Sequence, residues 1–279
     1  METILRRNTL RLERDGAVGK LWLDRPEKLN AFTIEMWDEM AELGAELVAD
    51  PGDLRALVVI GEGRAFSSGI DTAVFTSGAF GGGKPEDRPA PIRHEDPFAD
   101  AVLRTQDAYS WLETAPFATI AAVRGFALGA GLQLALACDL RVFARGAIVG
   151  LLELQYGIMP DLGGTQRLPR LVGPGKAKEL VFTGAKIDAE EAHRIGIAEQ
   201  LVDDADLDAA VDALATRIAG RPPLAVRGAK AAINAATEVS VADGLRVEAE
   251  RQSVCLRSSD MAEAIGAFVE GREPNYRAK

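Results

Sequence analysis

The stretch 117–139, FATIAAVRGFALGAGLQLALACD, constrains the fold most, because it joins two apolar runs through a glycine-rich turn. The first run, 120–123, is short and β-branched, which favours a buried strand. The second run, 132–138, has the composition and spacing of a buried helix. Gly129 and Gly131 lie between the two runs, and glycine allows the backbone to turn tightly and to approach a ligand closely.

The start of the helix in this stretch is a candidate site for negative charge. The first amides of a helix have no intrahelical partner and lie at the positive end of the helix dipole. Such a turn can stabilise an anion or a developing oxyanion. The alternative is an ordinary strand-to-helix connection whose small residues ease packing. A second segment of the same kind, EGRAFSSGID at 62–71, follows another buried-strand pattern at 54–61 and favours the first interpretation.

Composition excludes several other classes of protein. The chain has 279 residues, 47% of them hydrophobic and 27% charged, which describes a globular protein with a large core. The net charge of −10 argues against nucleic acid or an anionic membrane as a general partner. Cys138 and Cys255 provide no disulfide framework or metal motif, and we expect Cys138 to be a small core residue. With neither a secretion signal nor a run of about 18 apolar residues, we expect a cytoplasmic protein.

The remaining pattern alternates between strands and helices. We expect strands at 9–13, 17–23, 54–61, 120–123, 140–144 and 147–150, and helices at 33–49 and 100–113. A further helix is expected to begin at Pro174 and to end at Gly184. Another is expected to begin at Asp188, which has capping-box spacing to Glu191.

The chain divides by pattern into two parts. Strands and helices alternate for about 200 residues, and from about residue 205 the pattern is helical throughout. We therefore expect an α/β core over 1–200 and a helical region over 201–279. The segment 77–97 combines a glycine run with four prolines and is expected to form a surface loop, either a lid or a tolerated insertion.

Five ordered motifs identify a known family. The pair AFSSGID (65–71) and VRGFALGAGLQLALACDLR (123–141) resembles the crotonase family, the enoyl-CoA hydratases and isomerases. LDRPEKLNAF (23–32), PDLGGTQRLPRLVG (160–173) and the run at 182–202 resemble the same family in the same order. The resemblance implies a crotonase-like fold of repeated ββα units, with C-terminal helices that form a homotrimer or a dimer of trimers. It also implies a coenzyme A thioester as substrate, with no metal and no separate cofactor.

The resemblance implies an oxyanion hole made of two main-chain N–H groups, those of Ile70 and Ala130. They would hold the thioester oxygen while it becomes an enolate, and one such donor is typically worth about 10²–10³ in rate. Ala130 stands where the family usually has glycine. Because the donor is a backbone group, the identity of the side chain at this position is secondary.

The resemblance also places three candidate catalytic residues. The two glutamates of the hydratases fall on Gln133 and Glu153, and glutamine orients water but cannot act as an acid or base. Asp161 stands where many hydratases have glycine and several isomerases have aspartate; its alternative role is a turn or helix N-cap. Apolar neighbours are expected to raise the pKa of Glu153. We therefore expect double-bond isomerisation ahead of hydration, with a non-catalytic acyl-CoA-binding protein as the third possibility.

Further residues of these motifs are expected at the substrate. Arg25, Lys28 and Arg64 fall in or near segments that contact coenzyme A phosphates in the family, although solvated surface cations would look the same. The other expected substrate contacts, which lie within the two turn motifs, are Ser68, Asp71 and Gly129.

Overall fold

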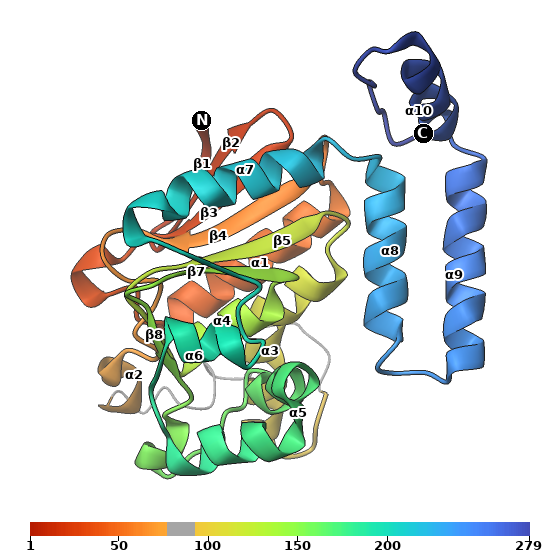
Figure 1. The fold of residues 1–279 in the computed structure, drawn as a ribbon. Coiled ribbons are helices and arrows are strands. Elements are labelled where there is room, and N and C mark those ends of the chain that lie inside the picture. Colours follow the sequence, from red (N-terminus) through yellow and green to blue (C-terminus); the bar gives the residue numbers. More distant parts are fainter. Residues whose placement is uncertain (77–92) are drawn as a thin grey trace.

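The computed structural model describes residues 1–76 and 93–279, and its centre is a seven-stranded sheet of order β1-β2-β3-β4-β5-β7-β10 (Figure 1). The first three strands pair antiparallel, and the strands from β3 to β10 pair parallel. The strands are β1 (Glu2–Arg6), β2 (Leu10–Asp15), β3 (Val18–Leu23), β4 (Ala56–Gly61), β5 (Ala118–Val123), β7 (Leu140–Ala144) and β10 (Gln200–Val202). The α/β prediction is confirmed.

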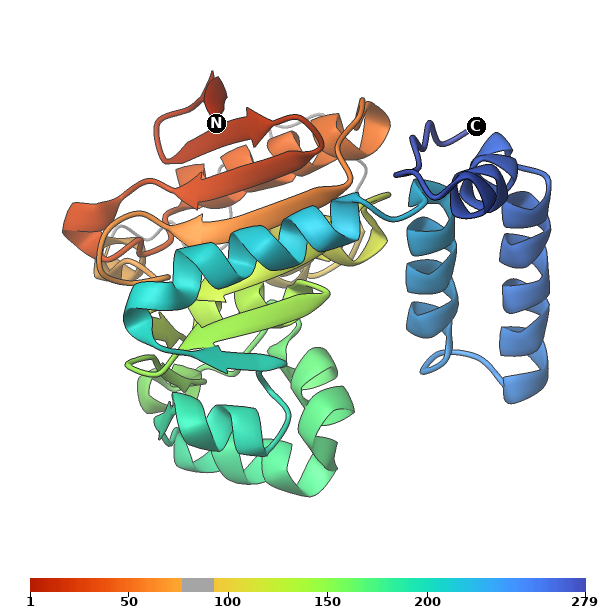
Figure 2. The same ribbon diagram turned by 45° about the horizontal axis from the view of Figure 1, so that its top comes forward.

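Helices cover both faces of the sheet, so its central strands are buried along their whole length. Every residue of β4 and β5 is buried, as expected for parallel strands between helical layers. Alternate residues of β4 separate the two faces. Leu57 and Val59 pack with α1 (Ile34–Ala49), α3 (Pro97–Thr114) and α4 (Ala130–Ala137). Val58 and Ile60 pack with α7 (Leu207–Ala219), which lies across the opposite face (Figure 2).

A second, three-stranded sheet of order β6-β8-β9 lies next to the predicted turns. Its strands are β6 (Phe126–Leu128), β8 (Ile148–Gly150) and β9 (Ile187–Asp188). The sequence predicts β8 but not β6 or β9, which are too short to show a pattern of their own. Ser67 donates its N–H to the Phe126 carbonyl at 2.8 Å and accepts from the Leu128 N–H at 3.0 Å. This pairing holds the 62–71 segment against the glycine turn before α4.

The helix boundaries agree well with the predicted start and stop signals. α5 (Gly164–Thr183) begins earlier than expected, but its helical geometry breaks at Gly173 (φ 77°), so a new segment does start at Pro174. Gly184 (φ 59°) ends it in the left-handed region. The Asp188 side chain accepts the Glu191 N–H and caps α6 (Ala189–Arg194). The remaining short elements are η1 (Pro26–Lys28), α2 (Thr72–Thr76), η3 (Glu153–Tyr156) and η4 (Asp204–Asp206).

The last three helices form an arm that stands away from the sheet (Figures 1 and 2). They are α8 (Pro223–Ala235), α9 (Val241–Leu256) and α10 (Ser259–Glu270). The boundary expected between residues 200 and 201 falls inside β10, and α7 shares a hydrophobic cluster with the sheet. The part that leaves the sheet therefore begins after α7.

Two further expectations concern the loop at 77–97 and membrane-spanning helices. Of the loop expected at 77–97, residues 77–92 lie outside the described residues. Asp96 caps α3, and Pro97 is its first residue. Across 1–76 and 93–279, no helix is both long and apolar enough to cross a membrane.

Candidate active site

The two predicted turns lie against each other at one small cavity. Gly69 (φ 105°) and Gly129 (φ 50°) both have backbone conformations that other residues rarely adopt. A Cβ atom at Gly69 would lie 3.0 Å from the Leu128 carbonyl oxygen and 3.9 Å from the Ala130 nitrogen. Residues of both turns, with Ile70 and Ala130 among them, line a cavity of about 60 Å³. The glycines are therefore required for the close approach of the two backbones.

The N–H groups of Ile70 and Ala130 are both available at this cavity. Ala130 is the first residue of α4, so its N–H has no intrahelical acceptor. Around Ile70, the bridge to Phe32 uses the carbonyl of Gly69 and the N–H of Asp71 and leaves the Ile70 N–H unused. Within the described part of the chain, neither N–H has a hydrogen-bond partner.

Glu153 lines the same cavity and keeps one carboxylate oxygen unpartnered. It begins η3, and only 4% of its surface is exposed. Its Oε1 accepts from Gln133 Nε2 at 2.8 Å, whereas the buried Oε2 has no partner among the described residues. Burial is the main cause that raises the pKa of Glu153, and the negative charge of Asp161 adds to it. The predicted direction of this pKa shift is confirmed, and Oε2 is free to bind a proton.

The amide nitrogen and the amide oxygen of Gln133 both form hydrogen bonds, and together they join Glu153 to the loop that precedes α5. The side chain is buried, and its Oε1 accepts the N–H groups of Leu162 at 2.8 Å and Gly164 at 2.9 Å. Because main-chain N–H groups only donate, these contacts fix Nε2 on the side of Glu153. The sequence predicts Gln133 at the site but does not reveal this contact. The glycine pair was the available signal, since a side chain at Gly164 would lie 2.9 Å from Gln133 Oε1.

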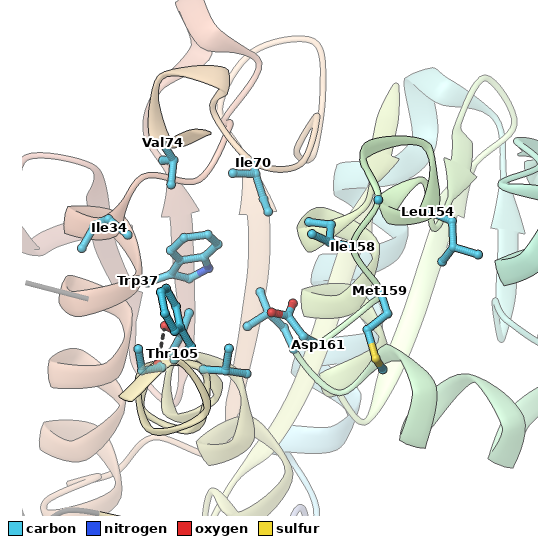
Figure 3. A pocket seen from close by; sticks show the side chains of 14 residues that line it. Ile34, Trp37, Ile70, Val74, Thr105, Leu154, Ile158, Met159 and Asp161 are labelled. Atoms are coloured by element: carbon cyan, nitrogen blue, oxygen red, sulfur yellow. Dashed lines mark hydrogen bonds between the residues drawn. The ribbon is translucent and has the colours of Figure 1, made fainter. Parts of the chain in front are cut away.

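Asp161 lies at a second and larger cavity of about 790 Å³ (Figure 3). In Figure 3 its carboxylate lies on the side of the cavity that faces Trp37 and Thr105. Desolvation by burial raises the pKa of Asp161. The alternative role as a helix cap is wrong, because the N-cap of α5 is Gly163 and no side chain caps that helix. Trp37 and Thr105 were not predicted at the site; the helical pattern of their segments showed only that one face is apolar.

Two of the expected substrate contacts, Arg25 and Asp71, bind each other, and their contact with substrate stays a prediction. Arg25 Nη2 lies 3.0 Å from Asp71 Oδ2, and Arg25 also donates to the Ala31 carbonyl. The other Asp71 oxygen accepts the Ala73 N–H at 3.1 Å at the start of α2. This backbone hydrogen bond is the main cause that lowers the pKa of Asp71, and Arg25 adds to it. The pair therefore holds the backbone that presents Ile70.

The other expected contacts are closer to the surface. Ser68 and Gly129 line the small cavity, and Ser68 Oγ donates to the Lys28 carbonyl at 3.4 Å. Lys28 and Arg64 are exposed, which leaves them accessible to a phosphate. Over the described ranges, no group of three or more His, Cys, Asp or Glu side chains is placed to hold a metal ion.

Comparison with known proteins agrees with the motifs. The family model described as enoyl-CoA hydratase/isomerase matches residues 13–279. The short-chain-enoyl-CoA hydratase of Clostridium acetobutylicum is 34% identical over 267 residues, which cover 95% of this chain and 96% of that protein. The crystal structure of an enoyl-CoA hydratase from Bacillus anthracis has a TM-score of 0.85 at 32% identity and covers 98% of this chain and 100% of its own.

A structure with a bound ligand is also similar. A Thermobifida fusca protein in complex with acetoacetyl-CoA has a TM-score of 0.78 at 40% identity and covers 89% of this chain and 94% of its own. These matches run over nearly the whole length of both partners. The fold is therefore the crotonase fold that the motifs predicted, and the chain belongs to the enoyl-CoA hydratase/isomerase family of enzymes.

Proposed function

We propose that this enzyme moves a carbon–carbon double bond within an enoyl-CoA thioester. The observation that carries the proposal is the pairing of two carboxyl groups, Glu153 and Asp161, around an amide, Gln133, that cannot exchange a proton. Hydration in this family uses a second glutamate at position 133, whereas a double-bond shift needs only proton removal and return. A coenzyme A thioester as substrate is supported by the acetoacetyl-CoA complex of the Thermobifida fusca protein.

The proposed first step forms an enolate at the small cavity. The thioester oxygen of a 3-enoyl-CoA accepts the N–H groups of Ile70 and Ala130. Glu153 Oε2 then takes a proton from C2, and the C–H electron pair moves through C1 to the thioester oxygen. Because the two donors are backbone groups fixed before the reaction, they stabilise the developing charge without reorganising.

The proposed second step returns a proton at the other end of the dienolate. Asp161, protonated at the start, delivers its proton to C4, and the double bond ends between C2 and C3. The product has the mass of the substrate, Glu153 ends protonated and Asp161 ionised, and exchange with solvent restores both. Burial raises the pKa of each carboxyl group, which makes each a better proton acceptor than an exposed carboxylate.

The direct test is product analysis of 2-enoyl- and 3-enoyl-CoA after incubation with the enzyme. We expect 3-enoyl-CoA to give a product of equal mass with the absorbance of a conjugated thioester. The proposal is rejected if 2-enoyl-CoA gains one water faster than the double bond moves. No product from any thioester would instead favour a binding protein that has lost the chemistry.

Hydration is the second candidate, and the name of the Clostridium acetobutylicum relative favours it. It would require Glu153 to activate the water and to return the proton to C2, since Gln133 only accepts from main-chain N–H groups and donates to Glu153. The same product analysis separates the two candidates by mass.

The arm supports a further part of the proposal, assembly into a homotrimer or a dimer of trimers; we also propose that the enzyme lies in the cytoplasm. Several large apolar side chains on α8, α9 and α10 are mostly exposed in the single chain: Ile233, Val241, Leu245, Phe268 and Val269. Burying such side chains against other copies would remove apolar area from water. Sedimentation equilibrium of the full chain measures the assembly directly, and a monomer at micromolar concentration would contradict it.

A further inference from the structure

The larger cavity points to the class of acyl group. We propose that it holds the acyl part of the substrate and that this part is an apolar chain of about eight or more carbons. This inference rests on the proposed function, because it takes the small cavity as the site of the thioester. It adds the chain length and polarity of the acyl group, and the length it assigns differs from the short acyl groups named for the Clostridium acetobutylicum and Thermobifida fusca proteins.

The two cavities adjoin each other at the reacting group. Ile70 and Ile158 line both of them, and Ile70 also supplies one of the two free N–H groups. A thioester oxygen held by Ile70 and Ala130 therefore directs the acyl chain past Ile70 into the larger cavity. Asp161 lies along that path, and α1, α2 and α3 provide the opposite wall (Figure 3).

The wall of the larger cavity offers almost no polar partner to an acyl chain. Thr105 Oγ1 donates to the Ala101 carbonyl at 3.0 Å, and Trp37 Nε1 donates to the Tyr109 hydroxyl at 3.1 Å. Asp161 is the acidic residue among the described lining residues, and none of them is lysine or arginine. A carboxylate on the acyl chain would therefore lose its hydration without a cation to replace it, which strongly disfavours polar acyl groups.

The size of the cavity favours a long chain over a short one. At about 30 Å³ per non-hydrogen atom, the volume that liquid water takes per molecule, a four-carbon acyl group needs on the order of 120 Å³. The cavity has about 790 Å³. Phe98 and Met159 line it and are 66% and 57% exposed, so a short chain would leave these apolar side chains in water. A longer chain would cover them, and burying apolar surface is favourable.

The first test measures binding of saturated acyl-CoAs, which do not react, by calorimetry on the full chain. The probes are butyryl-, octanoyl-, decanoyl- and glutaryl-CoA. At about fourfold in affinity per buried methylene, decanoyl-CoA is expected to bind at least about 100-fold more tightly than butyryl-CoA. Glutaryl-CoA is expected to bind no more tightly than butyryl-CoA. Equal affinity for butyryl- and decanoyl-CoA, or tighter binding of glutaryl-CoA, overturns the inference.

The second test fills the cavity from α3 with Ala101→Phe and uses Ala209→Phe, on the exposed side of α7, as the matched control. Ala101→Phe is expected to weaken decanoyl-CoA binding at least about tenfold and to change butyryl-CoA binding less than twofold. Ala209→Phe is expected to change neither. An equal loss of affinity for both ligands in Ala101→Phe would contradict the assignment of the large cavity to the acyl chain. If this variant fails to fold, the binding series of the unmodified chain tests the same assignment.

Activity separates this inference from the proposed function. A double-bond shift on four-carbon but not on ten-carbon substrates would overturn the chain-length inference and leave the proposed function standing. No double-bond shift at any chain length would reject the proposed function, while the binding series would still report whether the cavity takes a long apolar chain.

Discussion

The two cavities that meet at Ile70 and Ile158 have walls of different kinds. The small cavity is formed largely by backbone turns whose conformation requires glycine at Gly69 and Gly129. The large cavity is formed by side chains from three helices and from the segment around Asp161. Backbone donors stay in place when neighbouring side chains change, whereas a side-chain wall changes its shape with each substitution.

This difference separates chemistry from specificity in the molecule. The two turns keep two N–H groups at the small cavity whatever the side chains at Ile70 and Ala130. The acyl group that fits is decided by residues such as Trp37 and Ala101, which take no part in the proposed proton transfer. Variants of the small cavity should therefore lower turnover of all substrates. Variants of the large cavity, apart from those of the proposed proton donor Asp161, should change the choice among them.

The largest expected effect comes from removing the base of the small cavity. Glu153→Gln keeps the size of the side chain but cannot exchange a proton, so kcat should fall about 10²–10⁴-fold for every active substrate. Glu250→Gln, on the exposed surface of α9, is the control and should leave kcat unchanged. A Glu153→Gln enzyme with normal turnover would show that the small cavity does not perform the chemistry.

The next effect comes from disturbing the backbone of the turn. Gly69→Ala places a Cβ atom 3.0 Å from the Leu128 carbonyl oxygen at φ 105°, so the turn must shift. Displacing one oxyanion donor should lower kcat by about 10²–10³-fold, with little change in the relative rates for different chain lengths. Gly16→Ala is the matched control, because its φ is also positive (55°) but no atom lies within 4 Å of the added Cβ. If both variants lose the same activity, general strain and not the position of the N–H groups is responsible.

The sequence predicted the small cavity far better than the large one. Its two turns depend on local rules, since glycine is needed where φ is positive and the first helical N–H is always free. The contact of Gln133 with the N–H groups of Leu162 and Gly164 joins segments 29 and 31 residues apart, and no local pattern reports it. The lining of the large cavity comes from helices whose periodicity shows an apolar face but not what that face meets.

Gln133 joins Glu153, which lines the small cavity, to Leu162, which lines the large one. Its substitution is expected to have a smaller effect than the two changes above. Gln133→Leu leaves the buried N–H groups of Leu162 and Gly164 without an acceptor, at about 1–3 kcal/mol of unfolding free energy for each group. Gln133→Glu keeps the acceptor, so it should restore most of that stability in urea unfolding. Equal stability of Gln133→Leu and the unmodified chain would show that the amide does not hold the loop.

Gln133→Glu should also move the pH dependence of activity. It places a second carboxylate in contact with Glu153 Oε1, where the Gln133 amide now lies at 2.8 Å. Two like charges this close favour the protonated form of one of them, so the pKa of Glu153 should rise further. The base is then ionised only at higher pH, and the acidic limb of the kcat profile should shift upward. An unchanged limb would indicate that Glu153 is not the base.

The smallest expected effect is on stability and comes from the charge in the large cavity. Burial raises the pKa of Asp161, so the folded state binds a proton at pH values at which the unfolded state has released it. Stability from this group is therefore lost as the pH rises from the unfolded pKa through the folded pKa. Asp161→Asn removes that loss and should raise Tm at pH 8 by about 2–4 °C, the change that 1 kcal/mol produces in a chain of this size.

The pH dependence of this difference is the control. Below the pKa of an unfolded aspartate, about 3.9, Asp161 is protonated in both states, and the two proteins should unfold at nearly the same temperature. A difference in Tm that stays constant from pH 4 to pH 8 would mean that the substituted amide acts through packing and not through the loss of charge. A lower Tm for the variant at pH 8 would show that the Asp161 carboxylate is stabilised by its surroundings, and the large cavity would then no longer be an apolar counterpart to the small one.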